Sequence, residues 1–275
     1  SHYIVAHPTN ASLLFHASVG AVRSSNGGTS FSSISGLYSD NHDFAYDPTN
    51  PSILYSANDD GIYRSTNFGA TFTPVNGGLA TGQLYNGFSS SQTDSLLGLV
   101  QAQDHIPGYL YVGAGTWPQS AVDEAGWTAI NPVNDSIMYA VSRNGGAVYR
   151  STNRGVSFSG LVSLSSYGAW NSPIMIAPSA PSVIYVAKTK IFKAVEPAIG
   201  SRTALNGGAD LDGNPALSMA ISYSSPDTLY VGTGPYVTRA HLFRTTNGGT
   251  SWTDVTGPLP DRYPLDLAVD PRNSR

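Results

Sequence analysis

Hydrophobic and polar residues alternate along this chain in short runs, and turn-forming residues separate the runs. The second repeat shows the pattern clearly, with the runs DFAYDP, SILYSAN, GIYRST and ATFTPV between residues 43 and 75. Short alternating runs rich in Tyr, Val, Ile, Phe and Thr are typical of β-strands. No window keeps a helical period, so we expect at most a helical turn or two, within the irregular segment 79–92. The pattern therefore predicts an all-β protein.

One unit recurs at the end of several strands, and its clearest copy is HLFRTTNGGTSW, residues 241–252. Each copy is a strand followed by Ser/Thr-x-Asn-x-Gly-x-x-aromatic, which we call the box. The Asn side chain can accept backbone amide hydrogens within the turn, and the Gly can adopt a positive φ. We expect the aromatic residue to pack beneath the hairpin. The predicted structural turn residues are Asn26, Gly28 and Phe31, then Asn67, Gly69 and Phe72, then Asn153, Gly155 and Phe158, and finally Asn247, Gly249 and Trp252.

The boxes are regularly spaced. Their asparagines are separated by 67 − 26 = 41, 153 − 67 = 86 and 247 − 153 = 94 residues, and the last two steps are close to two repeats each. Degraded copies fill the gaps at YLYVGAGTW, which ends at Trp117, and at KIFKAVEPAIG, which starts at Lys190. A repeat of about 40–50 residues made only of strands and turns is typical of β-propeller blades.

We therefore predict a β-propeller of four-stranded antiparallel blades. Six blades and the first strand of a seventh are expected, with seven blades when the propeller is complete. The predicted single domain covers residues 1–275, with blades at about 1–40, 41–82, 83–125, 126–170, 171–215, 216–262 and, in part, 263–275.

Composition narrows the functional classes. Charged residues make up 12% of the chain and the net charge is −4, which argues against a nucleic-acid footprint of clustered Lys and Arg. The lysines gather at positions 188, 190 and 193, and we interpret them as a solvated strand edge. The absence of cysteine excludes disulfides and thiolate metal sites. The chain contains no apolar run of 18 residues, so the sequence predicts no membrane-spanning segment. We expect the sequence to be part of a longer exported chain whose targeting signal lies elsewhere.

The strings RSTNFGATF, RSTNRGVSF and RTTNGGTSW resemble the Asp-box, or BNR, repeat, with Asn where that family usually has Asp. The segments GWTAINPVNDSIMYAVSRNGGAVYRSTNRG and WTDVTGPLPDRYPLDLAVDPRN are similar to sortilin-type and xyloglucanase-type propellers of secreted bacterial proteins. The resemblance covers nearly the whole chain and implies a secreted, periplasmic or cell-surface location. It does not choose a function, because such blades serve glycosidases, sorting receptors and assembly factors alike.

The order of the strands predicts at which end of the blades a binding site would lie. Boxes join the third strand of a blade to the fourth, and x-Pro turns join the first to the second, so both lie at one end of the blade. Loops at the opposite end carry polar residues that do not repeat, and propeller pockets form from such loops. The predicted ligand-binding residues there are Asp59, Asp60, Gln103, His105, Glu124, Arg143, Trp117 and Trp170. For both tryptophans, burial between blades is the alternative that we favour.

Two classes of enzyme, glycoside hydrolases and sialidases, could use residues at this end of the blades. A glycoside hydrolase needs a pair of carboxylates, and Asp43, Asp104, Asp123 and Asp266 are the candidates, although we favour an acidic solvated rim as their explanation. The resembling xyloglucan-hydrolysing family places its cleft between two propellers, and its N-terminal catalytic Asp motif is not seen. Sialidase chemistry is disfavoured because the family's Arg-Ile-Pro motif is absent and Glu occurs only at 124 and 196.

One segment resembles the start of a calcium loop. Asp210, Asp212 and Asn214 alternate in NGGADLDGN, but the bidentate Glu that normally closes such a loop is missing. Calcium is thus the one cofactor considered. We predict a non-catalytic extracellular module that binds a protein or glycan through its loop-rich face. A xyloglucanase-like hydrolase or a degenerate relative is the first alternative, and a structural subunit of a larger surface assembly is the second.

Overall fold

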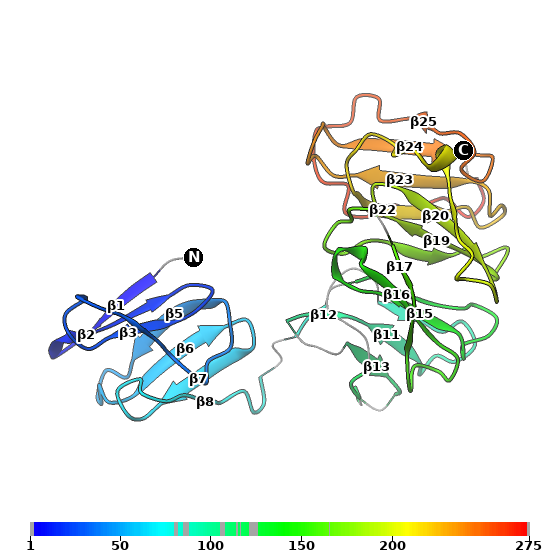
Figure 1. The fold of residues 1–275 in the computed structure, drawn as a ribbon. Helices are drawn as coiled ribbons and strands as arrows, with labels where there is room; N and C mark the ends of the chain where they lie inside the picture. The colour runs from blue at the N-terminus through cyan, green and yellow to red at the C-terminus, as the bar shows by residue number, and fades with distance from the viewer. Residues whose placement is uncertain are drawn as a thin grey trace. The chain divides into compact units, whose positions relative to one another are not determined.

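The computed structural model describes residues 3–79, 82–84, 88–104, 108–113, 115, 117–120, 126–164 and 166–273. The chain divides into two compact units, Ser1–Gly82 and Gln83–Arg275, and each is described by itself (Figure 1). The prediction that all blades form one domain stays a prediction. Within the described residues the regular structure is almost entirely β, as the alternating pattern predicted.

The first unit contains two four-stranded antiparallel sheets, each following the chain in simple order. Their strands are β1 (Tyr3–His7), β2 (Asn10–Ala17), β3 (Val22–Ser24) and β4 (Ser32–Ser33), then β5 (Asn41–Tyr46), β6 (Leu54–Asn58), β7 (Gly61–Ser65) and β8 (Thr73–Pro74). Strands β5 to β8 correspond to the four runs predicted for the second blade.

The second unit begins with a less regular region. A two-stranded pair joins β9 (Gln83–Leu84) to β12 (Ala102–Gln103), and a three-stranded sheet has the order β10-β11-β13. The strands of that sheet are β10 (Ser89–Ser90), β11 (Gly98–Val100) and β13 (Tyr109–Tyr111). This sheet occupies the span predicted for the third blade.

Three further four-stranded meanders complete the second unit. Their strands are β14 (Thr128–Ile130), β15 (Met138–Val141), β16 (Ala147–Ser151) and β17 (Ser159–Ser163), then β18 (Ile174–Ile176), β19 (Val183–Ala187), β20 (Ile191–Val195) and β21 (Thr203–Ala204), then β22 (Ala216–Ile221), β23 (Leu229–Thr233), β24 (His241–Thr245) and β25 (Thr253–Asp254). Each of the six spans predicted for a blade thus contains a sheet, and the blade boundaries themselves stay predictions. Residues 263–273 carry only an isolated bridge between Asp270 and Asn273.

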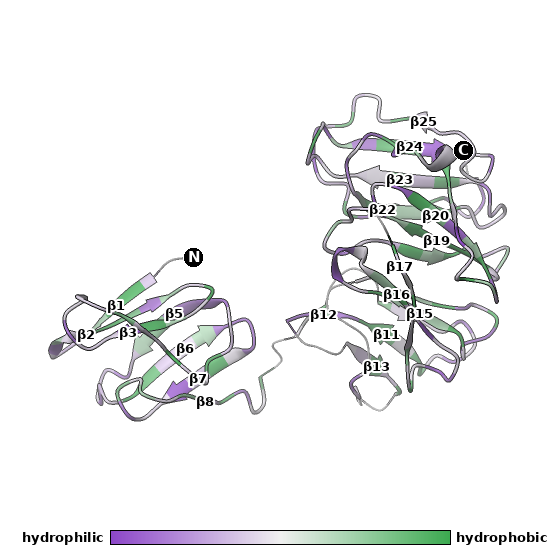
Figure 2. Ribbon diagram, in the orientation of Figure 1, coloured by the Kyte–Doolittle hydropathy of each residue, from purple (hydrophilic) through white to green (hydrophobic). Residues whose placement is uncertain are grey.

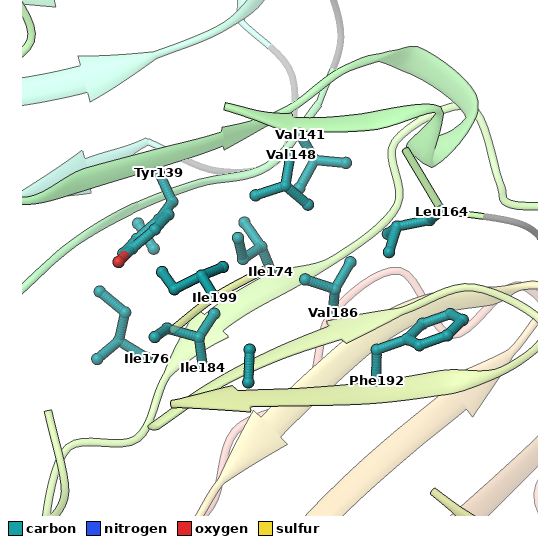
Figure 3. Packing of buried hydrophobic residues seen from close by; sticks show 12 residues of the cluster. Tyr139, Val141, Val148, Leu164, Ile174, Ile176, Ile184, Val186, Phe192 and Ile199 are labelled. Carbon is teal, nitrogen blue, oxygen red and sulfur yellow. The ribbon is translucent and has the colours of Figure 1, made fainter. Parts of the chain in front are cut away.

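Within each unit, hydrophobic packing joins each sheet to the next one along the chain. In the second unit, Tyr139 and Val148 of one sheet meet Ile174, Ile184 and Phe192 of the following sheet (Figure 3). Hydropathy along the ribbon shows the reason, because hydrophobic positions concentrate on the strands and hydrophilic positions in the turns (Figure 2). Strands β15 and β22 are buried at every position, so both faces of these strands are covered.

Short helical turns lie elsewhere than the sequence suggested. The structure places 3-10 turns at η1 (Arg143–Gly145) and η2 (Asn206–Gly208), and none among the described residues of 79–92. Asn144 has a φ of 57° inside η1, a conformation in which Asn is one of the better tolerated residues. Positive φ within a short turn is difficult to predict from hydrophobic periodicity.

Candidate functional site

Each box is closed by its own side chains, and the second box shows how. Ser65 Oγ accepts the Gly69 amide at 2.9 Å and donates to Asn67 Oδ1 at 2.8 Å. Asn67 Oδ1 also accepts the Thr71 amide at 3.0 Å. This amide lies four residues after the Asn, rather than the two expected from simple turn chemistry. Equivalent bonds form in the other three boxes.

The box glycine has a second role that the sequence did not reveal. Gly69 has a φ of 70°, and a Cβ on it would lie 2.3 Å from Cε1 of Phe15 in the preceding sheet. Glycine is therefore required by the turn and by the close approach of two sheets. The predicted burial of the box aromatic holds for Phe72, which is 7% exposed. It is wrong for Phe31, which is 45% exposed.

Ion pairs join successive blades near the boxes. Arg154 donates from Nη1 to both carboxylate oxygens of Asp135 at 3.0 Å and from Nη2 to Asp94 of the preceding sheet. Arg150 holds Glu196 of the following sheet with two bonds of 2.9 and 3.0 Å. The box end of the second unit is therefore occupied by structural contacts.

A different arrangement is found at the opposite end of the blades, in the loop that connects β17 to β18. Two backbone bonds hold this connecting loop, residues 166–172, between neighbouring turns. The Thr189 amide donates to the Tyr167 carbonyl and the Asn144 amide donates to the Trp170 carbonyl, both at 2.9 Å. Because the two donors belong to different sheets, the loop is clamped at both sides.

Lys188 lies beneath this clamped loop and is 2% exposed. Its Nζ donates to the Leu164 carbonyl at 3.1 Å, just before the loop. Burial lowers the pKa of Lys188 because it disfavours the charged ammonium. The prediction that lysines 188, 190 and 193 form a solvated edge is therefore wrong for Lys188, which is part of the core.

The clamped loop and the neighbouring turn η1 together display an aromatic platform, which we define as Arg143 of η1 with Tyr167 and Trp170 of the loop. Tyr167 is 65% exposed and Trp170 is 37% exposed. The guanidinium carbon of Arg143 lies 5.7 Å from the centroid of the Trp170 ring, within the range of a cation–π contact. Of the predicted ligand-binding residues, the structure thus brings Arg143 and Trp170 together and adds Tyr167, which the sequence analysis missed. Burial of Trp170 between blades, the favoured alternative, is wrong.

Trp117 also remains exposed, at 41%, so its burial between blades is likewise wrong. It packs against Tyr111, with ring centroids 4.9 Å apart, and more loosely against Phe88, at 6.3 Å. Phe88 lines a cavity of about 690 Å³ together with Trp127, Met175 and Asp266. Asp266 is the one acidic residue among the described residues that line this cavity.

The other candidate carboxylates have local partners. Asp43 accepts the Phe44 amide at 2.7 Å, and Asp59 contacts the His42 ring. Asp60 accepts the Tyr63 hydroxyl at 2.7 Å. Burial raises the pKa of Tyr63 to about 12, and the hydrogen bond to Asp60 adds to this shift.

Several candidates are not tested by this geometry. Gln103 is half-buried at the end of β12, and Asp104 follows it with a φ of 59°. His105, Asp123 and Glu124 lie outside the described residues. Catalytic roles for Asp43, Asp104, Asp123 and Asp266 therefore stay predictions.

The segment that resembled a calcium loop is tied to the protein instead. Asn214 is fully buried, and its Oδ1 accepts the amides of Tyr236, Val237 and Thr238. Asp212 Oδ2 accepts from Asn214 Nδ2 at 3.1 Å. Asp210 is exposed, and its backbone carbonyl accepts from Asn206. Calcium at these residues stays a prediction.

Comparisons with known proteins support the fold. No family model and no curated protein matches the chain. A GH74 xyloglucanase structure from Xanthomonas campestris is similar over 98% of this chain and 49% of its own, with a TM-score of 0.55 and 16% identity. The structure of an ancestral GH74 enzyme matches 99% of this chain and 33% of its own, with a TM-score of 0.44 and 20% identity. The structure of YCF48 bound to a D1 peptide matches 92% of this chain and 85% of its own, with a TM-score of 0.45 and 13% identity.

The fold is thus that of a multi-bladed β-propeller. The chain spans about half the length of the xyloglucanase to which it is similar. Among the described residues, no helix has the length and apolar character needed to cross a membrane.

Proposed function

We propose that this propeller is a non-catalytic binding module that engages a glycan or protein partner through its loop-rich end. The observation that carries the proposal is the aromatic platform of Arg143, Tyr167 and Trp170 on the clamped loop. Trp, Tyr and Arg are the residue types most enriched at binding hot spots. A ring held in place before binding also loses less conformational entropy on association.

The resemblance of the boxes to Asp-box repeats, and the fold shared with a xyloglucanase, support a polysaccharide as the first ligand to test. A planar indole can stack on the apolar face of a sugar ring, and an adjacent guanidinium can donate to hydroxyl groups. The same resemblance supports a location outside the cytoplasm.

A glycoside hydrolase is the second candidate, favoured by the xyloglucanase likeness. Hydrolysis needs two carboxylates about 5–5.5 Å apart for retention or 6.5–9.5 Å for inversion. The cavity in the second unit supplies Asp266, and a partner for it would have to come from residues such as Asp104 or Asp123.

The test is a binding and turnover screen of the full chain against xyloglucan, β-glucans and sialylated glycans, followed by affinity capture of proteins. Binding without turnover, weakened at least tenfold by Trp170→Ala and Tyr167→Ala, would support the proposal. Tyr263→Ala is the matched control, because Tyr263 is 55% exposed and lies outside the platform.

Turnover that disappears in Asp104→Asn, Asp123→Asn or Asp266→Asn would overturn the non-catalytic proposal. Binding of any ligand that is unchanged in the platform variants would overturn the assignment of the platform. A specific protein captured by the wild-type chain, but not by Trp170→Ala, would identify the partner as a protein rather than a glycan.

A further inference from the structure

His241, at the start of β24, is placed between two carboxylates that come from different parts of the last blade. Its Nδ1 lies 2.9 Å from Asp212 Oδ2, and its Nε2 lies 3.9 Å from Asp254 Oδ2. The His241 side chain is 20% exposed and Asp254 is 50% exposed, so solvent reaches this group. Neither the binding proposal nor the box chemistry uses these residues.

Asp212 fixes the orientation of the imidazole. The carboxylate oxygen that faces Nδ1 also accepts the Thr233 hydroxyl at 2.7 Å and Asn214 Nδ2 at 3.1 Å. A carboxylate accepts hydrogen bonds, so the neutral ring carries its proton on Nδ1. The lone pair of His241 is therefore on Nε2, which faces Asp254.

Asp254 is held from its other side. Its Oδ1 accepts the Thr256 amide at 2.8 Å and also the Thr256 hydroxyl. This leaves Oδ2 directed to His241. Two atoms that could bind a metal ion, His241 Nε2 and Asp254 Oδ2, thus face each other. Asp212 orients the histidine, and Thr256 orients the aspartate.

The gap between these atoms is too long for a hydrogen bond, which ends near 3.5 Å. An ion bound at about 2.0–2.2 Å from each atom would separate them by about 3.4 Å in tetrahedral geometry and by at most about 4.2 Å. The observed 3.9 Å is about 0.5 Å wider than the tetrahedral separation, so the exposed Asp254 carboxylate has to move toward His241 by about that much to complete the site. Histidines that bind metals usually donate their other N–H to a carboxylate, as His241 does to Asp212.

We propose that His241 Nε2 and Asp254 Oδ2 form a binding site for a divalent transition-metal ion of the zinc and nickel class, with water completing the coordination. Imidazole with carboxylate favours zinc, copper and nickel, whereas calcium prefers sites built only of oxygen. The proposal differs from the calcium loop predicted from sequence, because Asp212 orients a ligand here and Asn214 holds backbone amides.

Arg239 lies two residues before His241 in the sequence, and its positive charge would oppose a bound cation. The Arg239 guanidinium donates to the Leu259 carbonyl at 2.8 Å. Removing its charge should therefore tighten the binding of a divalent ion while the two ligands stay in place.

The test is titration of the untagged chain with zinc chloride, nickel chloride and calcium chloride, followed by calorimetry and by NMR of the imidazole nitrogens. We expect zinc and nickel to bind and to shift the Nε2 resonance of His241. His241→Ala and Asp254→Asn should each weaken binding at least tenfold, which is the effect of losing a metal ligand or its support. Arg239→Gln should strengthen it several-fold.

His42→Ala is the matched control, because His42 also contacts a carboxylate, that of Asp59. Equal loss of binding in His42→Ala, or a zinc titration that leaves the His241 resonances unchanged, would overturn the proposal. Binding of calcium with the same affinity as zinc would also overturn it. Thermal unfolding of each variant without metal checks that the fold is retained, and Arg239→Gln gives a gain that misfolding cannot imitate.

Discussion

The Trp170 carbonyl accepts the Asn144 amide at 2.9 Å, while the Trp170 ring carries the guanidinium of Arg143, the residue before Asn144. Backbone and side-chain contacts thus join the same two segments, η1 and the connecting loop. A ligand that orders one of these segments will order the other, so the platform should respond to binding as one unit.

Lys188 anchors the start of this loop, and its removal should separate loop order from overall stability. In Lys188→Met, we expect the free energy of unfolding at pH 7 to equal or exceed that of the wild type by up to about 1 kcal/mol, because an apolar side chain replaces a buried charge. Amide hydrogen exchange in residues 166–172 should be faster, since the bond to Leu164 is lost. Lys190→Met is the control, and unchanged exchange in Lys188→Met would contradict the anchoring role.

The pKa of Lys188 gives this prediction a pH dependence. Its value in the folded state lies below that in the unfolded state, so the folded state binds fewer protons between the two values. The stability of the wild type should therefore rise, through this group, as pH increases toward about 10.5. The Met variant should lack this contribution in denaturant titrations made at a series of pH values.

The bond between Arg150 and Glu196 should contribute more to stability than the more exposed pair of Lys193 and Asp227. Arg150 and Glu196 side chains are 22% and 11% exposed, and Glu196→Gln removes the charge while keeping the shape. We expect a loss of about 1–3 kcal/mol in urea unfolding. Lys193→Gln, which breaks the more exposed pair with Asp227, should cost less than about 1 kcal/mol. Equal costs would show that burial does not set the strength of these pairs.

The box should tolerate Asp in place of Asn. Asn67→Asp keeps the oxygen that accepts from Ser65 and Thr71, and the hydroxyl of Thr71 can turn to donate to the new carboxylate. We expect a change within about 1 kcal/mol, whereas Asn67→Ala should cost about 1–2 kcal/mol because the Thr71 amide loses its acceptor. Thermal or urea unfolding of the two variants measures the difference, and a larger loss for Asp would show that the amide donor is essential.

Tyr63 should make the first unit sensitive to alkaline pH. Its pKa is about 12 in the folded state and about 10 in an unfolded chain. The folded state therefore holds the proton more tightly, and this group's contribution to stability is fully present below pH 10 and is lost as pH rises toward 12. Tyr63→Phe should reduce the alkaline loss of stability, while Tyr3→Phe, at a residue 44% exposed, should not.

Repeating features were the ones that the sequence predicted well. The strands of the second blade and the positions of Asn67 and Gly69 follow from local alternation and turn chemistry, which are visible in a single copy and reinforced by the others. The two faces of the blade follow from strand order. The position of a blade in the chain can be predicted from local sequence, because the strands of each four-stranded sheet pair with the strands next to them in the sequence.

Features that depend on contacts between sheets were not predictable in the same way. The burial of Lys188 depends on a loop more than fifteen residues earlier, and the exposure of Phe31 depends on what packs outside its own hairpin. No sequence motif surrounds Tyr167. The one feature that could have indicated its role is its position in a loop that does not follow the repeat. His241 belongs to the clearest copy of the repeat, so its second role was hidden by the first.

In every box the Ser or Thr and the Asn make their side-chain hydrogen bonds within the box itself, so a copied segment brings these bonds with it. Gene duplication can therefore add a blade whose hairpin forms at once, and mutation can then alter the loops at the other end without disturbing that hairpin. The four boxes keep the same bond from the Asn side chain to the amide four residues later. Sequence change in such a chain can therefore concentrate in the loops at the opposite end of the blades.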